Sequence, residues 1–173
     1  MSTLMTDRQK REKEYYNEFA VQFDVSKHPV DLSPITRPMN GTETRPWNSY
    51  WAIYAMAINN YKEEARLLDF GTGPGDNALR FSTIGYDVEG FDISEANIEI
   101  AKKIFKANSK IGNFQVSTAE KLPYSDNSFD VIIGIDILHH VNIAESIGEC
   151  YRVLKPGGKA FFREPVEVPL LDM

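Results

Sequence analysis

The chain has 173 residues, which at roughly 150 residues per domain corresponds to a single domain. Apolar residues make up 42% of the sequence, enough to form a hydrophobic core and too many for a disordered chain. The 19 Lys and Arg residues face 25 Asp and Glu residues, so the net charge is −6. Because affinity for nucleic acid comes mostly from neutralising phosphates, we expect no nucleic-acid partner for this acidic chain.

The cysteine count and the apolar runs exclude several further classes. Cys150 is the single cysteine, so neither an intramolecular disulfide nor a cysteine zinc cluster can form, and no metal is expected. The longest uninterrupted apolar stretch is 51–58, far short of the roughly 20 residues that span a bilayer. The first 16 residues are charged and lack the apolar core of a secretory signal. We therefore expect a cytoplasmic protein without a membrane span.

The first third of the chain predicts two helices joined by a loop. In residues 7–23, aromatic residues recur at helical spacing behind Asp7, which can cap the helix. Residues 24–46 contain four prolines, each of which removes an amide donor and restricts the preceding residue, so a loop is expected. Residues 47–61 are apolar on most faces and predict a second helix.

From Arg66 onward, predicted strands alternate with predicted helices. The expected strands are 67–70, 87–91, 114–117, 130–135 and 159–163, and the expected helices are 76–84, 95–107 and 143–153. The sequence LKPGG before the last strand predicts a turn. Such alternation predicts an α/β fold with a mostly parallel sheet and helices on both faces. Ligands of these sheets bind at the edge where the strands end.

A glycine-rich turn, DFGTGPG at residues 69–75, follows the first of these strands and opens a helix. Glycines at alternate positions permit a tight turn and a close approach of a ligand to the backbone, although a turn without a ligand is the simpler interpretation. Asp92 ends the next strand, 19 residues beyond Gly73, where a carboxylate can accept hydrogen bonds from both hydroxyls of a ribose. Asp76 occupies the third glycine position of the dinucleotide signature and would repel a pyrophosphate. A nucleoside without phosphates is therefore favoured over NAD or a nucleotide sugar.

Residues 66–164 resemble the class I S-adenosylmethionine (SAM)-dependent methyltransferases. Four segments carry the resemblance in the family's order: LLDFGTGPG, GFDIS, STAEKLPYSDNSFDVIIGIDILHHV and CYRVLKPGGKAFF. The resemblance implies a Rossmann-like sheet and SAM as the cofactor. The segment ILHHV looks more like the methyltransferases that modify quinones and sterols than like those that methylate DNA adenine, which often carry N/D-P-P-Y after the fourth strand.

The resemblance also implies which residues contact SAM. The turn holds the methionine and ribose parts, the second strand end holds the ribose, the third faces the adenine, and the fourth lies beside the methyl group. These residues are Asp69, Gly71, Thr72, Gly73 and Gly75 in the turn, Asp92 and Ile93 after the second strand, Thr118, Ala119 and Glu120 after the third, and Ile135 and Asp136 after the fourth. Thr118 departs from the family pattern, in which an aspartate is common at this position.

The expected reaction is transfer of the sulfonium methyl of SAM to a small-molecule acceptor, in which the protein mainly positions the reactants and excludes water. A general base is needed only if the nucleophile arrives protonated. His139 and His140 follow the fourth strand at the correct edge of the sheet and are the candidates, although local packing or capping is the simpler interpretation.

Residues 1–61 are expected to form a cap or lid over residues 62–173, the SAM-binding domain. The family places its N-terminal helices over the cofactor edge, and aromatic side chains with a polar tip suit an acceptor pocket. The aromatic residues of this region are Tyr15, Tyr16, Trp47, Tyr50 and Trp51, and the first four are the acceptor candidates. The alternative is that these aromatic residues only cover the sheet.

The family sheet has seven strands in the order 3-2-1-4-5-7-6, and this chain supplies the first five. Strand 159–163 would then be an open edge at which the chain pairs with itself or with a partner. We expect a fragment of a longer protein, a product of a split gene or a shortened family member. A non-catalytic SAM-binding or partner-regulating module is the alternative function.

Overall fold

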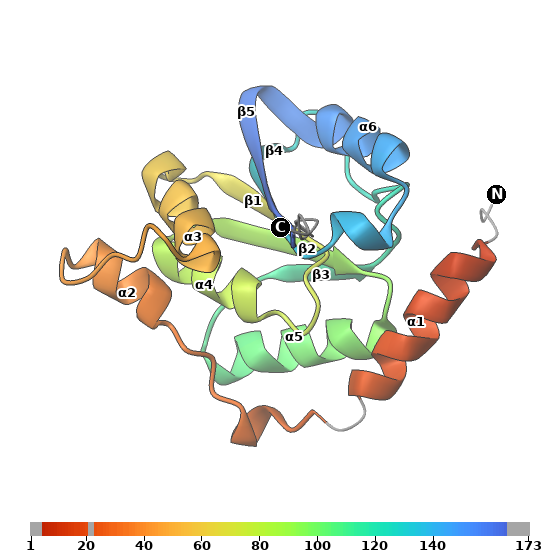
Figure 1. The fold of residues 1–173 in the computed structure, drawn as a ribbon, viewed down its shortest axis with the longest axis horizontal. Helices are drawn as coiled ribbons and strands as arrows, with labels where there is room; N and C mark the ends of the chain where they lie inside the picture. Colours follow the sequence, from red (N-terminus) through yellow and green to blue (C-terminus); the bar gives the residue numbers. More distant parts are fainter. Residues whose placement is uncertain (1–4, 21–22, 166–173) are drawn as a thin grey trace, which may run out of the picture.

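A parallel sheet of five strands in the order β3-β2-β1-β4-β5 lies at the centre of the protein (Figure 1). The computed structural model describes residues 5–20 and 23–165. The strands are β1 (Arg66–Phe70), β2 (Asp87–Asp92), β3 (Asn113–Val116), β4 (Phe129–Ile135) and β5 (Leu154–Arg163). All four neighbouring pairs are parallel. This arrangement confirms the predicted Rossmann-like α/β fold and the order of the first five strands.

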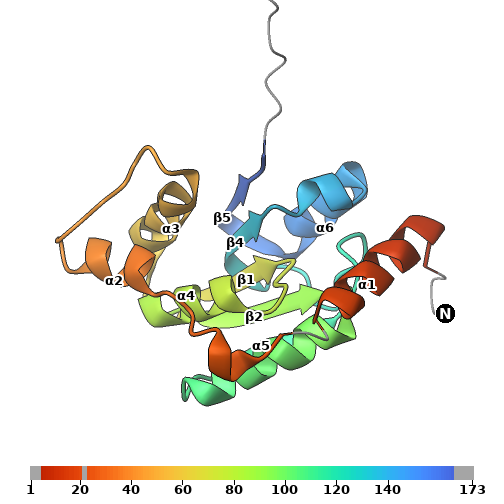
Figure 2. The same ribbon diagram turned by 60° about the horizontal axis from the view of Figure 1, so that its bottom comes forward.

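Helices cover both faces of this sheet, as Figures 1 and 2 show. The helices are α1 (Asp7–Ala20), α2 (Ser33–Met39), α3 (Ser49–Asn60), α4 (Asp76–Ile84), α5 (Glu95–Ala107) and α6 (Ile143–Val153), with short 3-10 turns η1 (Val25–Lys27) and η2 (Leu138–His140). Alternate residues of β1 enter different cores: Leu67 packs with α3, α4 and α5, whereas Leu68 and Phe70 pack on the α6 side. No helix in the described part of the chain is long and apolar enough to span a membrane.

The prediction that residues 24–46 form a loop is wrong, because α2 lies within them. Pro34 stands in the first turn of α2, where a missing N–H costs no helical hydrogen bond. The carboxylate of Asp31 accepts a hydrogen bond from the backbone N–H of Ser33 (2.9 Å), and Ile35 is fully buried. Pro38 is near the end of the helix, which stops at Met39. Tertiary burial thus outweighs the proline content of the segment.

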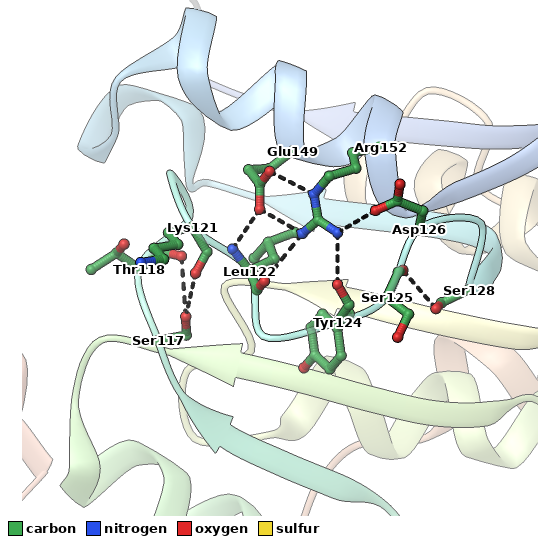
Figure 3. Close-up of polar contacts among 10 residues, drawn as sticks. All are labelled: Ser117, Thr118, Lys121, Leu122, Tyr124, Ser125, Asp126, Ser128, Glu149 and Arg152. Atoms are coloured by element: carbon green, nitrogen blue, oxygen red, sulfur yellow. Dashed lines mark hydrogen bonds and ion pairs between the residues drawn. The ribbon is translucent and has the colours of Figure 1, made fainter. Parts of the chain in front are cut away.

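Arg152 of α6 fixes the loop that joins β3 to β4 (Figure 3). Its guanidinium donates hydrogen bonds to the carbonyl oxygens of Tyr124 (2.7 Å) and Leu122 (3.1 Å). It also contacts Glu149 (2.7 Å) and Asp126 (2.9 Å) in ion pairs. The Glu149 carboxylate in turn accepts from the backbone N–H of Leu122 (2.7 Å). The loop that carries residues 118–120 is therefore held by a network based on α6.

The predicted turn at LKPGG and the predicted last strand merge into β5. Leu154 is aligned with Phe129, and the register then shifts so that Lys159 is aligned with Val131. Residues 155–158 form the irregular part of the strand, with Gly157 at a φ of +79°. β5 lies at one end of the strand order, which agrees with the expected edge. Pairing of this edge with another chain stays a prediction.

Candidate functional site

The glycine-rich turn between β1 and α4 presents backbone rather than side chains to the sheet edge. Gly71, Gly73 and Gly75 all have positive φ. A Cβ at Gly73 would meet no atom within 4 Å, whereas a Cβ at Gly71 would lie 2.7 Å from Ile137 and one at Gly75 would lie 2.8 Å from Ala101. Gly73 therefore leaves open space for a ligand, and Gly75 serves close packing of the turn against α5.

A cavity of about 250 Å³, the first cavity, lies beside this turn at the carboxyl ends of β1, β2 and β4 and the loop after β3. Among the residues predicted to contact SAM, its walls contain Gly71, Thr72, Gly73, Asp92, Ile93, Thr118, Ala119, Glu120, Ile135 and Asp136. Asp69 and Gly75 are not in the walls. Asn97, Ser117 and Val141 line the cavity without having been predicted, although each lies next to a predicted loop.

Asp92 ties three parts of the first cavity together. One carboxylate oxygen, Oδ2, accepts from the backbone N–H of Gly73 (3.0 Å). The other, Oδ1, accepts from the backbone N–H of Ser94 (2.9 Å) and from the side-chain amide of Asn97 (3.2 Å). Burial raises the pKa of Asp92, and these hydrogen bonds oppose the shift. A carboxylate has about four lone-pair sites, so Asp92 can still accept a further hydrogen bond from a ligand.

Asp69 lies beneath the turn rather than in the cavity. Its carboxylate accepts a hydrogen bond from the hydroxyl of Thr72 (2.7 Å). Burial raises the pKa of Asp69 to about 7, with only partial compensation from the hydrogen bond of Thr72. Asp69 thus orients the turn through Thr72, which is the part of its predicted role that the geometry supports.

Helix α1 covers the first cavity through polar contacts with three loops. Tyr16 and Glu12 contact the two ring nitrogens of His140, at 3.1 Å from Nε2 and 3.2 Å from Nδ1. The Gln9 amide donates to Glu120 (2.9 Å). Further contacts join Arg8 to the carbonyl of His139, Asn17 to Ser94, and Lys13 to Glu95. Within α1, whose residues are all described, only Ala20 is buried.

The two predicted catalytic histidines have different surroundings. His140 lines the first cavity, but both of its ring nitrogens already contact α1. His139 lies outside the walls of the first cavity, and its Nδ1 lies 2.7 Å from the carboxylate of Glu164. Glu164 also accepts from the backbone N–H groups of Ile137 (2.8 Å) and Leu138 (2.7 Å). Burial disfavours its ionisation, yet the hydrogen bonds from His139 and the backbone hold the pKa of Glu164 below its ordinary value.

A second cavity of about 430 Å³ adjoins the first. Helix α3 contributes Tyr50, Trp51 and Tyr54 to its walls, α4 contributes Asp76, Asn77 and Arg80, and Pro34 and Asn48 complete this part. Five residues line both cavities: Thr72, Pro74, Asn77, Ile135 and Asp136. The shared residues mark the place where the two cavities meet.

Asp136 stands at this junction in a left-handed conformation, with a φ of +56°, which is uncommon for a residue other than glycine. Its carboxylate accepts a hydrogen bond from the hydroxyl of Tyr50 (2.9 Å) and pairs with Arg163. The guanidinium of Arg163 lies 4.0 Å from the ring centre of Tyr50. Strained backbone that the surroundings hold in place is frequent at functional sites.

The predicted acceptor residues are separated by the structure. Tyr50 lines the second cavity, and Tyr16 lines the first. Tyr15 and Trp47 are 63% and 81% exposed and lie in the walls of neither cavity. The second cavity also contains Trp51, which is next to Tyr50 in the sequence, and Tyr54, one helical turn after Tyr50, which sequence reasoning missed.

Several known proteins similar to this chain are named as methyltransferases. A C-methyltransferase of ubiquinone and menaquinone biosynthesis (UbiE) from Geotalea daltonii is 36% identical over 120 residues, which cover 66% of this chain and 51% of that protein. A demethylmenaquinone methyltransferase from Chlorobaculum parvum is 29% identical over 171 residues, 95% of this chain and 64% of that protein. The crystal structure of a SAM-dependent methyltransferase from Methanosarcina mazei is 28% identical, covers 63% of this chain and 56% of its own, and has a TM-score of 0.58.

This chain spans about half the length of the first of these relatives and under two thirds of the second. The methyltransferase domain family matches residues 68–162, which is more than half of the chain and includes every strand end that lines the first cavity. The matched region, the strand order and the glycine-rich turn agree on one family. The chain belongs to the class I SAM-dependent methyltransferases.

Proposed function

We propose that the chain binds SAM in the first cavity and that the methyl group passes to a small-molecule acceptor in the second. SAM bound there would supply a methyl group on a sulfonium: the acceptor nucleophile would bond to the methyl carbon as the carbon–sulfur bond breaks, leaving S-adenosylhomocysteine. The observation that carries the proposal is the junction: Thr72, Ile135 and Asp136 belong to the walls of both cavities. A donor in one cavity and an acceptor in the other would meet there.

The residues of the first cavity suit the chemistry of SAM. Asp92 offers a carboxylate to the ribose hydroxyls, and the open space at Gly73 admits the ligand against the backbone. Ile93 and Ala119 provide apolar surface for the adenine, and Thr118 offers a hydroxyl where the family often has a carboxylate. Glu120 is held by Gln9 and by the backbone N–H of Asn142 (2.9 Å), so it joins the adenine side to α1.

The protein's own contribution is positioning and the exclusion of water. We propose that residues 1–61 act as the cover, with α1 over the first cavity and α3 beside the second. His140 connects this cover to the end of β4 through Tyr16 and Glu12. Proton transfer by His139 or His140 stays a prediction, and Glu164 is the group that would orient the ring of His139.

The acceptor is proposed to be a quinone-type small molecule. The relatives named for ubiquinone and menaquinone biosynthesis support this class, and so do the aromatic side chains of the second cavity. Binding of SAM without transfer to any acceptor would instead favour the non-catalytic module.

Replacement of Asp92 tests the cofactor site. Asp92→Ala should weaken SAM binding by about 1–3 kcal/mol, because the ribose hydroxyls and the Gly73 amide both lose a charged acceptor. Isothermal titration calorimetry with SAM and S-adenosylhomocysteine measures the change. Asp87→Ala, at the opposite end of the same strand, is the matched control. Unchanged affinity in a folded Asp92→Ala variant would contradict the proposal.

A further inference from the structure

The second cavity contains a carboxylate without a hydrogen-bond partner. Asp76 is the first residue of α4, and its side chain makes no hydrogen bond or ion pair with the part of the chain that the structure describes. Its Oδ1 atom is buried. Leaving a carboxylate oxygen away from water without a donor is costly, and burial raises the pKa of Asp76. A bound molecule that donates a hydrogen bond would remove this cost.

Position at the start of a helix does not by itself explain Asp76. An acidic side chain in the first turn is favoured by the helix macrodipole, whereas hydrogen bonds to the first-turn amides come mainly from the N-cap residue. The N-cap of α4 is Gly75, which has no side chain, so Asp76 stands one position further into its helix than the capping residues Ser94 of α5 and Asn142 of α6, and its carboxylate accepts no hydrogen bond among the described residues. The carboxylate is therefore available to the cavity rather than used by the helix.

The charges around the second cavity favour a neutral donor over a cation. Arg80 lines the same cavity, and within the described residues its guanidinium contacts neutral oxygens rather than carboxylates: the Tyr54 hydroxyl (3.2 Å), the Asn77 side chain (2.9 Å) and the carbonyl of Asp31 (2.9 Å). Its charge lies close enough to oppose the shift in the pKa of Asp76. The other carboxylate of the cavity, that of Asp136, is paired with Arg163. No net negative charge is left for a cationic ligand to neutralise.

Three of the other wall residues, all on α3, are aromatic. Trp51 and Tyr54 are buried on α3 and line the cavity together with Tyr50. Such surfaces favour unsaturated rings, and one polar group among them orients the ligand.

We propose that Asp76 determines acceptor specificity by binding a hydroxyl group, and that the acceptor is a neutral hydroxylated aromatic compound with its ring against α3. This inference rests on the proposed function, because it takes the second cavity as the acceptor site. It adds the chemical group that the protein recognises and the residue that recognises it.

The test uses three naphthalene probes that differ in one substituent: 2-naphthol, 2-methoxynaphthalene and the cation of 2-(aminomethyl)naphthalene. Calorimetry measures their binding to the full chain saturated with S-adenosylhomocysteine. We expect 2-naphthol to bind at least about tenfold more tightly than the methoxy compound, which cannot donate a hydrogen bond. Asp76→Ala should reduce this ratio to about two or less, and Asp87→Ala should leave it unchanged.

The inference would be overturned by equal binding of the hydroxyl and methoxy probes to the natural chain, by tightest binding of the cation, by binding of none of the three, or by an Asp76→Ala variant that keeps the natural ratio. Asp76→Leu, which keeps a branched side chain but has no hydrogen-bond acceptor, replaces Asp76→Ala if the latter does not fold. S-adenosylhomocysteine is titrated into each variant first. If Asp76→Ala weakens this binding as much as Asp92→Ala does, Asp76 belongs to the cofactor site and the inference fails. If S-adenosylhomocysteine does not bind the natural chain, the proposed function fails instead.

Discussion

Helices α1 and α3 both precede the sheet in the sequence, and each forms a wall of one cavity, on opposite sides of the molecule (Figures 1 and 2). They are held by different forces. α3 buries Trp51, Ile53, Tyr54 and Ala57 against the sheet and α4. α1 buries only Ala20 and is joined to the loops by ion pairs and hydrogen bonds near the surface.

The two helices therefore differ in how firmly they are held to the rest of the fold. Surface ion pairs contribute at most about 1 kcal/mol each, so α1 can leave the first cavity without loss of the fold. Buried side chains contribute several times more, so the wall that α3 provides persists whenever the protein is folded. We infer that the first cavity has a removable cover and the second a permanent wall.

The largest expected effect is a loss of stability when a buried residue of α3 is replaced, compared with an exposed residue of α1. Ile53→Ala should lower the free energy of unfolding by about 2–5 kcal/mol, because Ile53 is 4% exposed and its removal leaves a cavity in the core. Phe19→Ala on α1, where the side chain is 66% exposed, should change it by no more than about 0.5 kcal/mol. Urea denaturation followed by circular dichroism measures both. Similar losses for the two variants would remove the distinction between the helices.

The second effect concerns the floor of the first cavity, by which we mean the glycine-rich turn at residues 69–75 with Asp69 beneath it. Like the wall that α3 provides, this floor persists whenever the protein is folded. The pKa of Asp69 is raised from 3.8 to about 7 in the folded protein, so between about pH 4 and pH 7 the folded state binds more protons than the unfolded state. The Asp69 contribution to the free energy of unfolding therefore falls as pH rises, by at most about 1.4 kcal/mol per pH unit.

Asp69→Asn cannot titrate and should lack this contribution. As pH rises through this window, the free energy of unfolding of the natural chain should fall relative to that of the variant. Urea unfolding at several pH values measures it. A difference that is independent of pH would show that Asp69 titrates normally.

The third effect tests whether the floor rather than the cover holds the cofactor. Gly73→Val should weaken SAM binding at least about tenfold, because the side chain occupies the space beside the cavity and the residue has a φ of +51°. Gly41→Val carries the same substitution at a similar φ of +67°, also in open space but outside both cavities. Calorimetry should show normal SAM affinity for this control. Equal losses in the two variants would assign the effect to backbone strain alone.

The smallest expected effect comes from weakening the attachment of α1, the cover of the first cavity. Lys13→Gln removes the ion pair between α1 and Glu95 and should raise the dissociation rate of S-adenosylhomocysteine about twofold, consistent with the small energy of a surface pair. Lys102→Gln removes a comparable pair with Glu99 within α5 and should leave the rate unchanged. Stopped-flow fluorescence measures the rates. A tenfold change from Lys13→Gln would mean that α1 is held more firmly than surface contacts allow.

Sequence patterns predicted the sheet because its signals are local. β4 is nearly continuous in apolar residues, and Asp92 and Gly73 stand at the ends of strands that the alternation already located. The structure brings Asp92 and Gly73 within hydrogen-bond distance, as a shared sheet edge requires. Their role in binding SAM stays a prediction until affinity is measured.

What the sequence did not predict depends on contacts between distant segments. Gly73 and Gly75 look equivalent in the sequence, and only the position of Ala101 on α5 shows that one faces a cavity and the other a helix. Glu164 and Arg152 read as ordinary charged residues, yet one caps η2 beside His139 and the other holds the β3–β4 loop. α2 was missed because the burial of Ile35 is a tertiary effect.

The close packing of the glycine-rich turn has a consequence for how such sequences can vary. A methyl group at Gly71 would collide with Ile137, one at Gly75 with Ala101, and one at Gly90 with Thr72. A Cβ at position 75 would lie 2.8 Å from both the Cα and the Cβ of Ala101, so even a glycine at 101 would leave a collision with the backbone, and only movement of α5 could accommodate a larger residue at 75. We expect functional variants selected from a library randomised at 75 and 101 to keep glycine at 75, whichever small residue stands at 101, because Gly75 also has a φ of +94°.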